Sequence, residues 1–204
     1  ATSNTRAAIW DAMKRKETYA SSGPRITVRF FGGFDLPANV AAADLVATGY
    51  AKGVPMGGDL KGSGKAPTFL VAAIKDPDGA NLDRVQIVKG WVDAAGKTHE
   101  KVIDVKWSGT RKPDAKGKLP PVGNTVDLAT AKYTNSIGAE QLVGSFTDTE
   151  FDPKARSFYY ARVVEIPTPR WTLYDTIKFK VKMDPKVPMI QQERAFTSPI
   201  WYTC

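Results

Sequence analysis

The sequence predicts a mainly β protein: an antiparallel β-sandwich with one N-terminal helix and long loops. Two observations support this fold class. Short runs of apolar and β-branched residues follow one another with turn residues between them, and no helical segments separate them as a doubly wound parallel sheet requires. The chain has 204 residues, of which 42% are hydrophobic and 25% charged, so it contains enough apolar material for a buried core.

The first expected element is a helix that is capped by Ser3 or Asn4 and ends near residue 16. It carries an apolar stripe with Trp10 beside it, made of Ala8, Ile9, Ala12 and Met13. Residues at this spacing lie on one face of a helix. A short extended or turning link follows, and the Gly-Pro pair at 23–24 ends any helical pattern.

From residue 25 the hydrophobic period changes to two, because Ile26, Val28 and Phe30 alternate with polar residues. This alternation predicts a half-buried strand that ends at the glycines of 32–33. Residues 34–67 are rich in glycine and proline, and we expect a long loop with one short element.

The next segments predict a strand and then a hairpin. Residues 68–74 form a continuous apolar run that is followed by a turn at 76–79. Residues 84–91 and 101–107 read as paired strands, and Gly96 takes the left-handed position in the loop between them. Residues 108–124 are expected to form an exposed loop. Further strands are expected at 125–128, 139–147, 157–166, 177–183 and 193–202.

The formal net charge of +8 raises the question of an acidic partner. The basic residues are scattered rather than gathered on one face, so we expect no nucleic-acid partner. A single cysteine, Cys204, excludes an internal disulfide bond. No apolar run approaches the length of a membrane helix, and we therefore expect no membrane span.

Charged and aromatic residues gather around the prolines of 167–169. Glu165, Arg170 and Asp175 allow two interpretations: a carboxylate acid or base with an arginine clamp for an anion, or a structural corner. In the second interpretation Arg170 pairs with Glu165 or Asp175, and Trp171 packs beneath. We favour the structural corner, because no second carboxylate is spaced for paired catalysis.

Two other motifs are weaker than they first look. The glycine-rich stretch 57–66 departs from a phosphate-binding loop, because Asp59 stands where glycine is required and Ala66 where serine or threonine is required. His99 is the only histidine and has no metal-ligand spacing around it, so we expect a solvent-exposed residue at a strand end. We therefore assign no catalytic residue and no metal ligand to this chain.

Aromatic residues are plentiful, with five Trp, seven Tyr and nine Phe. Tyr159 with Tyr160, or Trp171 with Tyr174, could form a stacking platform for a sugar or a base. Core packing is the commoner use of such side chains, and we favour it.

Four segments carry a resemblance to a known family: NTRAAIWDAMKRKETYASSGPRITVRFFGG, APTFLVAAIKDPDGANLDRVQIVKGW, RSFYYARVVEIPTPRWTLYD and ERAFTSPIWYT. Together they resemble the C-terminal third of a bacterial family of unknown function. That family is similar to the PHP metallohydrolases, named for polymerase and histidinol phosphatase. The resemblance implies that residues 1–24 are the last helix and exit loop of a mostly absent barrel, and that 25–204 form an appended β-sandwich.

The resemblance also implies a function. The barrel would hydrolyse ester or phosphoester bonds with divalent Mn, Zn or Fe, held in the absent N-terminal region. This chain would support the mouth of the active site without being catalytic alone, and the barrel of the same protein would be its partner. Ser21 and Ser22, in the exit loop, would lie nearest to the substrate. The resemblance suggests an extracytoplasmic, periplasmic location.

The competing interpretation is an independent β-sandwich module that binds a carbohydrate or a cell-surface ligand. An exposed aromatic row on one sheet face, together with covered Ile9 and Trp10, would favour the module. An uncovered apolar patch around Ile9, Trp10 and Met13 would favour a domain of a larger protein.

Overall fold

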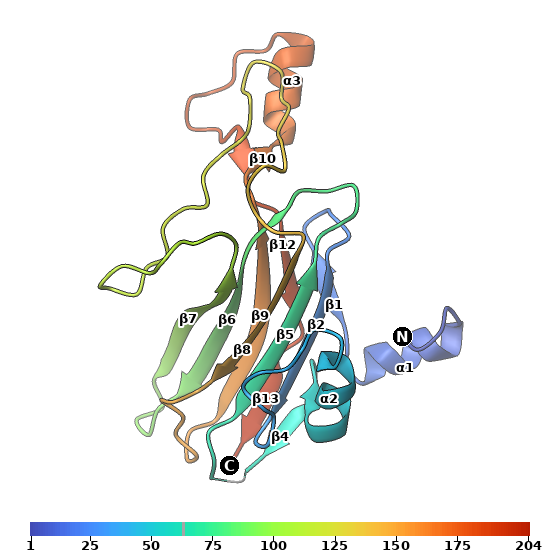
Figure 1. Cartoon of the computed structure of the whole chain (residues 1–204), viewed down its shortest axis with the longest axis vertical. Helices are drawn as coiled ribbons and strands as arrows, with labels where there is room; N and C mark the ends of the chain where they lie inside the picture. The colour runs from blue at the N-terminus through green and yellow to red at the C-terminus, as the bar shows by residue number, and fades with distance from the viewer. Residues whose placement is uncertain (63) are drawn as a thin grey trace.

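The computed structural model describes residues 1–62 and 64–204, and its fold confirms the predicted class. Two sheets face each other as a sandwich, and the helices lie at its margins (Figure 1). Strand pairing is antiparallel throughout the larger sheet except at one edge. The helices described are short, and none of them is long and apolar enough to cross a membrane.

The larger sheet is built around strand β9 (Ser157–Glu165). One edge of β9 pairs along its length with β6 (Leu82–Val92), which pairs in turn with β7 (Thr98–Trp107). Its other edge is shared by two strands. β12 (Arg194–Thr197) and then β1 (Tyr19–Ser21) extend the sheet at one end, while β13 (Ile200–Thr203) and the parallel β4 (Asp59–Lys61) extend it at the other.

The smaller sheet has the order β3 (Val54–Pro55), β2 (Thr27–Gly33), β5 (Thr68–Ile74) and β8 (Gln141–Thr147). The predicted alternation in β2 is confirmed, because Ile26, Val28 and Phe30 are all buried. They pack against inward side chains of the larger sheet, including Val85, Ile87, Tyr159, Ala161 and Val163. Burial of apolar surface between the sheets is the main source of stability for such a sandwich.

The hairpin of β6 and β7 is also confirmed. Asp93 and Lys97 close its loop by a backbone hydrogen bond of 3.0 Å, and Gly96 has a φ of +79°. That left-handed conformation suits glycine, as the sequence indicated. The buried strand at 68–74 and the turn after it are confirmed as well.

The long loop predicted for 34–67 holds more structure than expected. Helix α2 (Leu45–Lys52) packs on β2, with Leu45 and Phe31 buried together in a second apolar cluster. The short strands β3 and β4 follow it. Gly49 allows this contact, because a methyl group there would lie 2.4 Å from the Phe31 ring. The sequence predicted only one short element here because few apolar residues fall at a helical period.

Three strand predictions are corrected. Residues 125–128 contribute a single bridge, between Asp127 and Lys132. The run 193–202 forms two strands, because it is interrupted at 198–199, where proline cannot donate a ladder hydrogen bond. The run 177–183 is not a strand: helix α3 (Trp171–Phe179) continues through its first three residues and ends at Lys180, whose φ is +54°.

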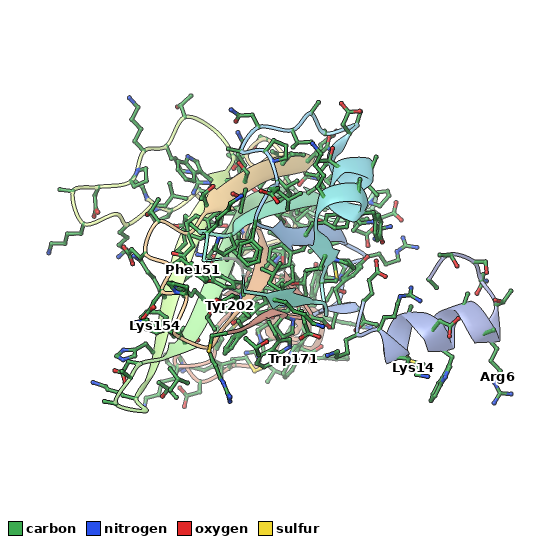
Figure 2. The ribbon with its side chains drawn as sticks, turned by 90° about the horizontal axis from the view of Figure 1, so that it is seen from below. Arg6, Lys14, Phe151, Lys154, Trp171 and Tyr202 are labelled. Carbon is green, nitrogen blue, oxygen red and sulfur yellow. The ribbon has the colours of Figure 1, made fainter. Side chains whose placement is uncertain are left out.

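Helix α1 (Arg6–Lys14) projects away from the sandwich (Figures 1 and 2). Its cap is Thr5 rather than Ser3 or Asn4, because the Thr5 hydroxyl accepts a hydrogen bond from Ala8 N at 3.3 Å. The link after it is a strand, not a free connection. β1 pairs with β12, so Tyr19 lies opposite Thr197 and Ser21 opposite Ala195.

Candidate functional site

Two residues singled out in the sequence, Ser22 and Glu165, lie with Glu193 at one end of the larger sheet. Ser22 follows β1, Glu193 precedes β12, and Glu165 ends β9. The Ser22 hydroxyl donates a hydrogen bond to the Glu193 carboxylate and accepts one from Arg194 N at 2.9 Å. Glu165 N donates to the Glu193 carbonyl at 2.9 Å. Glu193 therefore connects Ser22 to Glu165, two residues that lie far apart in the sequence.

Glu165 is the most unusual group in this cluster. Its side chain is 1% exposed, and Oε1 has no hydrogen-bond partner in the described part of the chain. Burial, reinforced by the nearby charges of Glu193 and Asp76, raises the pKa of the Glu165 carboxyl to about 8. The group is therefore mostly protonated at neutral pH. A protonated carboxyl can donate a proton, but no nucleophile stands next to it within the described chain.

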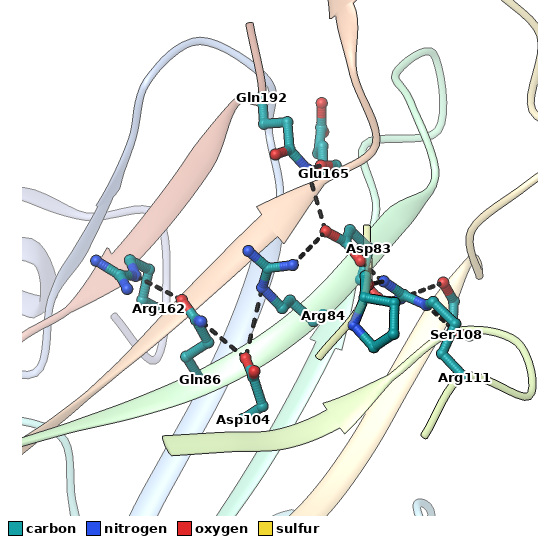
Figure 3. A network of polar contacts seen from close by, with 10 residues as sticks. Asp83, Arg84, Gln86, Asp104, Ser108, Arg111, Arg162, Glu165 and Gln192 are labelled. Carbon is teal, nitrogen blue, oxygen red and sulfur yellow. Dashed lines mark hydrogen bonds and ion pairs between the residues drawn. The ribbon is translucent and has the colours of Figure 1, made fainter. Parts of the chain in front are cut away.

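A buried polar network lies beside Glu165 and joins three strands to two loops (Figure 3). Asp83 is buried, and its carboxylate accepts hydrogen bonds from Arg111 Nη2 at 2.7 Å, Arg84 Nη1 at 3.0 Å and Gln192 Nε2 at 3.1 Å. Gln192 Nε2 also donates to the Glu165 carbonyl at 2.7 Å. Arg84 Nε makes no hydrogen bond within the described chain, and it lies 3.4 Å from Asp104 Oδ1 as an ion pair. The other donors named here bond to groups on neighbouring elements and hold those elements together, so we interpret the network as structural.

Arg170 does not make the predicted ion pair with Glu165 or Asp175. Its guanidinium carbon instead lies 5.6 Å from the Trp171 ring centre, and the described ion pairs include none from Arg170. Arg170 caps helix α3, and Asp175 follows it by five positions. On a helix, side chains three or four positions apart are neighbours, and a spacing of five does not bring the two side chains together. Trp171 is exposed rather than packed beneath the corner.

The predicted corner at 167–170 is present, and backbone hydrogen bonds hold it in place. β10 (Thr168–Pro169) pairs with β11 (Ile190–Gln191), and Arg170 N donates to the Met189 carbonyl at 2.9 Å. Thr172 Oγ1 adds a bond of 2.7 Å to the Pro188 carbonyl. Both β10 and α3 lie beyond the end of the sheets (Figure 1).

Ser21 and Ser22 are both exposed at the sheet edge. The Ser21 hydroxyl makes no hydrogen bond to any residue that the structure describes, whereas Ser22 is held by Glu193 and Arg194. Their nearness to a substrate stays a prediction.

His99 is more constrained than the sequence indicated. Its ring is stacked on Trp91, with ring centres 5.1 Å apart, and Nε2 lies 2.7 Å from Asp93 Oδ2. The hydrogen bond from His99 is the main cause that lowers the pKa of the Asp93 carboxyl. The pair holds the hairpin loop together.

One buried ion pair was missed. Lys89 Nζ lies 2.6 Å from Asp148 Oδ2, and the Tyr159 hydroxyl donates to the same oxygen at 2.6 Å. All three side chains lie inside the sandwich, and burial raises the pKa of the Tyr159 hydroxyl. The signal was present in the sequence, because Lys89 takes an inward position two residues after Ile87 in a predicted strand.

No group of three or more His, Cys, Asp and Glu side chains is placed to hold a metal ion within residues 1–62 and 64–204. The residues that are described therefore do not fit the divalent metals of the resemblance. The glycine-rich stretch 57–66 contains Ser63, which lies outside the described residues. Asp59, within that stretch, belongs to strand β4.

The class defined by these features is a β-sandwich domain with a projecting helix and no assembled catalytic centre among the described residues. The whole chain, residues 1–204, matches a family model described as "Protein of unknown function (DUF3604)". The chain belongs to this family. No curated protein and no solved structure matches the chain.

Proposed function

We propose that this chain is the C-terminal β-domain of a PHP-like metal-dependent hydrolase of ester or phosphoester bonds. In this proposal the metals, Mn, Zn or Fe, and the catalytic residues belong to a preceding barrel of the same protein. The β-domain supports the mouth of the active site and is not catalytic alone. The PHP link comes from the sequence resemblance, and the structure contributes an argument about the partner.

The observation that carries the proposal is the uncovered face of α1. Ile9, Trp10 and Met13 are 43%, 62% and 53% exposed, and Ala12 is the one buried residue of the helix. The hollow beside them is lined by α1 residues alone. Large apolar side chains gathered on one projecting helix are typical of a surface that another domain covers. Burying a fully exposed apolar side chain is worth roughly 1.5–3 kcal/mol, and covering these half-exposed side chains would gain about half of that each.

The path of the chain after α1 supports the role at the active-site mouth. Residues 15–18 connect the end of α1 to strand β1, whose three residues span about 10 Å and end at Ser21, directly before Ser22. A domain that covers α1 would therefore lie within reach of these two hydroxyls. Glu193, which holds Ser22, would face the same space.

The independent binding module is the second candidate. It required an aromatic row on a sheet face and covered side chains at Ile9 and Trp10. The aromatic row is present, on the outer face of the larger sheet, but Ile9 and Trp10 are exposed. We therefore favour a domain of a larger protein, and a ligand on the aromatic row is a separate question.

Activity of two proteins tests the proposal. One is the 204-residue chain, and the other includes the sequence encoded upstream of it. Each is assayed with bis-p-nitrophenyl phosphate and p-nitrophenyl acetate in the presence of Mn²⁺, Zn²⁺ or Fe²⁺. We expect metal-dependent turnover from the longer protein only. Turnover by the 204-residue chain above the metal blank would refute the assignment of the chemistry to another domain.

Hydrogen exchange tests the docking of α1 separately. We expect amides of α1 to exchange rapidly in the 204-residue chain and slowly in the longer protein, because docking buries the helix. Trp10→Ser combined with Met13→Ser should remove that protection. Ile177→Ser, which changes an exposed apolar residue on α3, serves as the matched control. Equal exchange of α1 in both proteins would contradict the proposed interface.

A further inference from the structure

The outer face of the larger sheet carries a row of side chains that crosses five strands. The register places each member opposite the next, because Gly90 pairs with both Glu100 and Phe158, and Trp201 pairs with both Phe158 and Asp59. We call this set the cross-strand row. In order it contains Glu100, Gly90, Phe158, Trp201 and Asp59. Neighbouring strands lie about 4.8 Å apart, so the row spans roughly 19 Å.

The centre of the cross-strand row is an aromatic hollow. Gly90 has no side chain, and the Phe158 ring occupies the space above it: a methyl group at Gly90 would lie 2.3 Å from Phe158 Cζ. The Trp201 ring centre lies 5.3 Å from that of Phe158, and Trp201 is 41% exposed. Ligand sites in proteins typically have volumes of about 300–1,000 Å³, and this hollow measures ≈ 650 Å³.

The two ends of the cross-strand row are polar and unpaired. Glu100 and Asp59 are exposed, and neither carboxylate makes a hydrogen bond or an ion pair in the described part of the chain. The guanidinium of Arg156, which also lines the hollow, is exposed and similarly unpaired among the described residues. The site thus combines an apolar floor with acceptors at both ends and a donor at its rim.

We infer that the cross-strand row binds a neutral oligosaccharide. A sugar ring presents apolar C–H groups on its face and hydroxyl groups at its edge, so its face fits an aromatic floor and its edge fits carboxylate and guanidinium groups. Two carboxylates at the ends disfavour a polyanion, and the arginine at the rim disfavours a polycation. This inference does not depend on the proposed function.

A second copy of the chain fits the face less well. A protein surface laid over the row would bury Glu100, Asp59 and Arg156, and removing unpaired charges from water is costly. Sugar hydroxyls would keep the same three groups hydrogen-bonded. The length of the row suits a chain of several sugar rings rather than a monosaccharide.

Calorimetric titration of the 204-residue chain tests the inference. The probes are cellohexaose, xylohexaose, mannohexaose and chitohexaose, each at millimolar concentration. We expect at least one to bind, and Trp201→Ala to weaken that binding about tenfold, as loss of an aromatic stacking partner does. Trp171→Ala, which removes an exposed tryptophan from α3, should leave the affinity unchanged.

A second variant tests the inference independently in case Trp201→Ala does not fold. Glu100→Gln combined with Asp59→Asn changes two exposed groups, so its circular dichroism should match that of the parent, and its affinity should fall. The inference is overturned if none of the four probes binds, or if Trp201→Ala and Trp171→Ala bind equally well. It is also overturned if sedimentation reveals a dimer that Trp201→Ala abolishes and no probe displaces.

Discussion

Substitution of Glu165 by glutamine should change how stability depends on pH. The ordinary pKa of this carboxyl is 4.5, and in the folded protein burial raises it to about 8. Between these two values the folded state holds a proton that the unfolded state releases. The stabilising contribution of the protonated group is therefore complete below about pH 4.5 and is lost as pH rises toward 8.

The size of the effect follows from linkage. One extra bound proton changes the free energy of unfolding by about 1.4 kcal/mol per pH unit. From pH 5.0 to pH 7.5 the parent protein should therefore lose roughly 3 kcal/mol relative to Glu165→Gln, whose amide does not titrate. The two proteins should have similar stability near pH 4.5, apart from a constant offset caused by the amide.

Urea denaturation followed by tryptophan fluorescence measures this difference at pH 5.0, 6.0, 7.0 and 8.0. Glu140→Gln is the control, because Glu140 is exposed and its substitution should leave the pH profile of the parent unchanged. Parallel stability curves for the parent and Glu165→Gln would refute the reasoning, since they would mean that Glu165 is ionised in the folded protein at neutral pH.

Three further substitutions test other parts of the structure. Lys89→Met should lower the free energy of unfolding by about 3–5 kcal/mol, because it leaves Asp148 buried without its cation; Lys89→Met combined with Asp148→Asn should recover part of the loss in urea denaturation. Gly90→Ala should cost about 1–3 kcal/mol, since the methyl group collides with Phe158, and an unchanged melting temperature would contradict that contact. Asp76→Asn should reduce the loss of stability in acid: hydrogen bonds from backbone N–H groups lower the pKa of Asp76 below 3.8, so the parent loses this stabilisation as pH falls, and thermal melts at pH 3 and pH 6 measure the difference.

Local pattern was sufficient to predict much of the sandwich. The hairpin loop around Gly96 and the alternation of Ile26, Val28 and Phe30 depend on near neighbours in the chain, and both are as predicted. Helix α3 was missed because residues 177–183 alternate apolar and lysine side chains, which is a strand pattern. The helix is instead supported by contacts such as that of Thr172 with the Pro188 carbonyl, which no local pattern reveals.

The candidate sites depended on pairing over long distances. The sequence analysis singled out Glu165, but its burial beside Glu193, 28 residues later in the chain, requires β9 and β12 to pair. Trp201 and Glu100 stand in one row only because β13, β9, β6 and β7 share a register. Composition cannot specify register, so neither the raised pKa of Glu165 nor the cross-strand row was predictable.

The attachment of α1 has a mechanical consequence. β1 follows α1 closely, is hydrogen-bonded to β12, and β12 is bonded to the central strand β9. Residues 15–18, which connect α1 to β1, are also packed against neighbouring segments. The Thr18 carbonyl accepts a hydrogen bond from Ser198 N at 3.0 Å, and Gly57 lies so close that a methyl group there would be 2.2 Å from the Lys16 carbonyl oxygen. A force applied to α1 would therefore be transmitted through β1 and β12 directly to β9, in the middle of the larger sheet. A domain that binds α1 would be coupled stiffly to the whole sandwich and would not swing on a flexible tether.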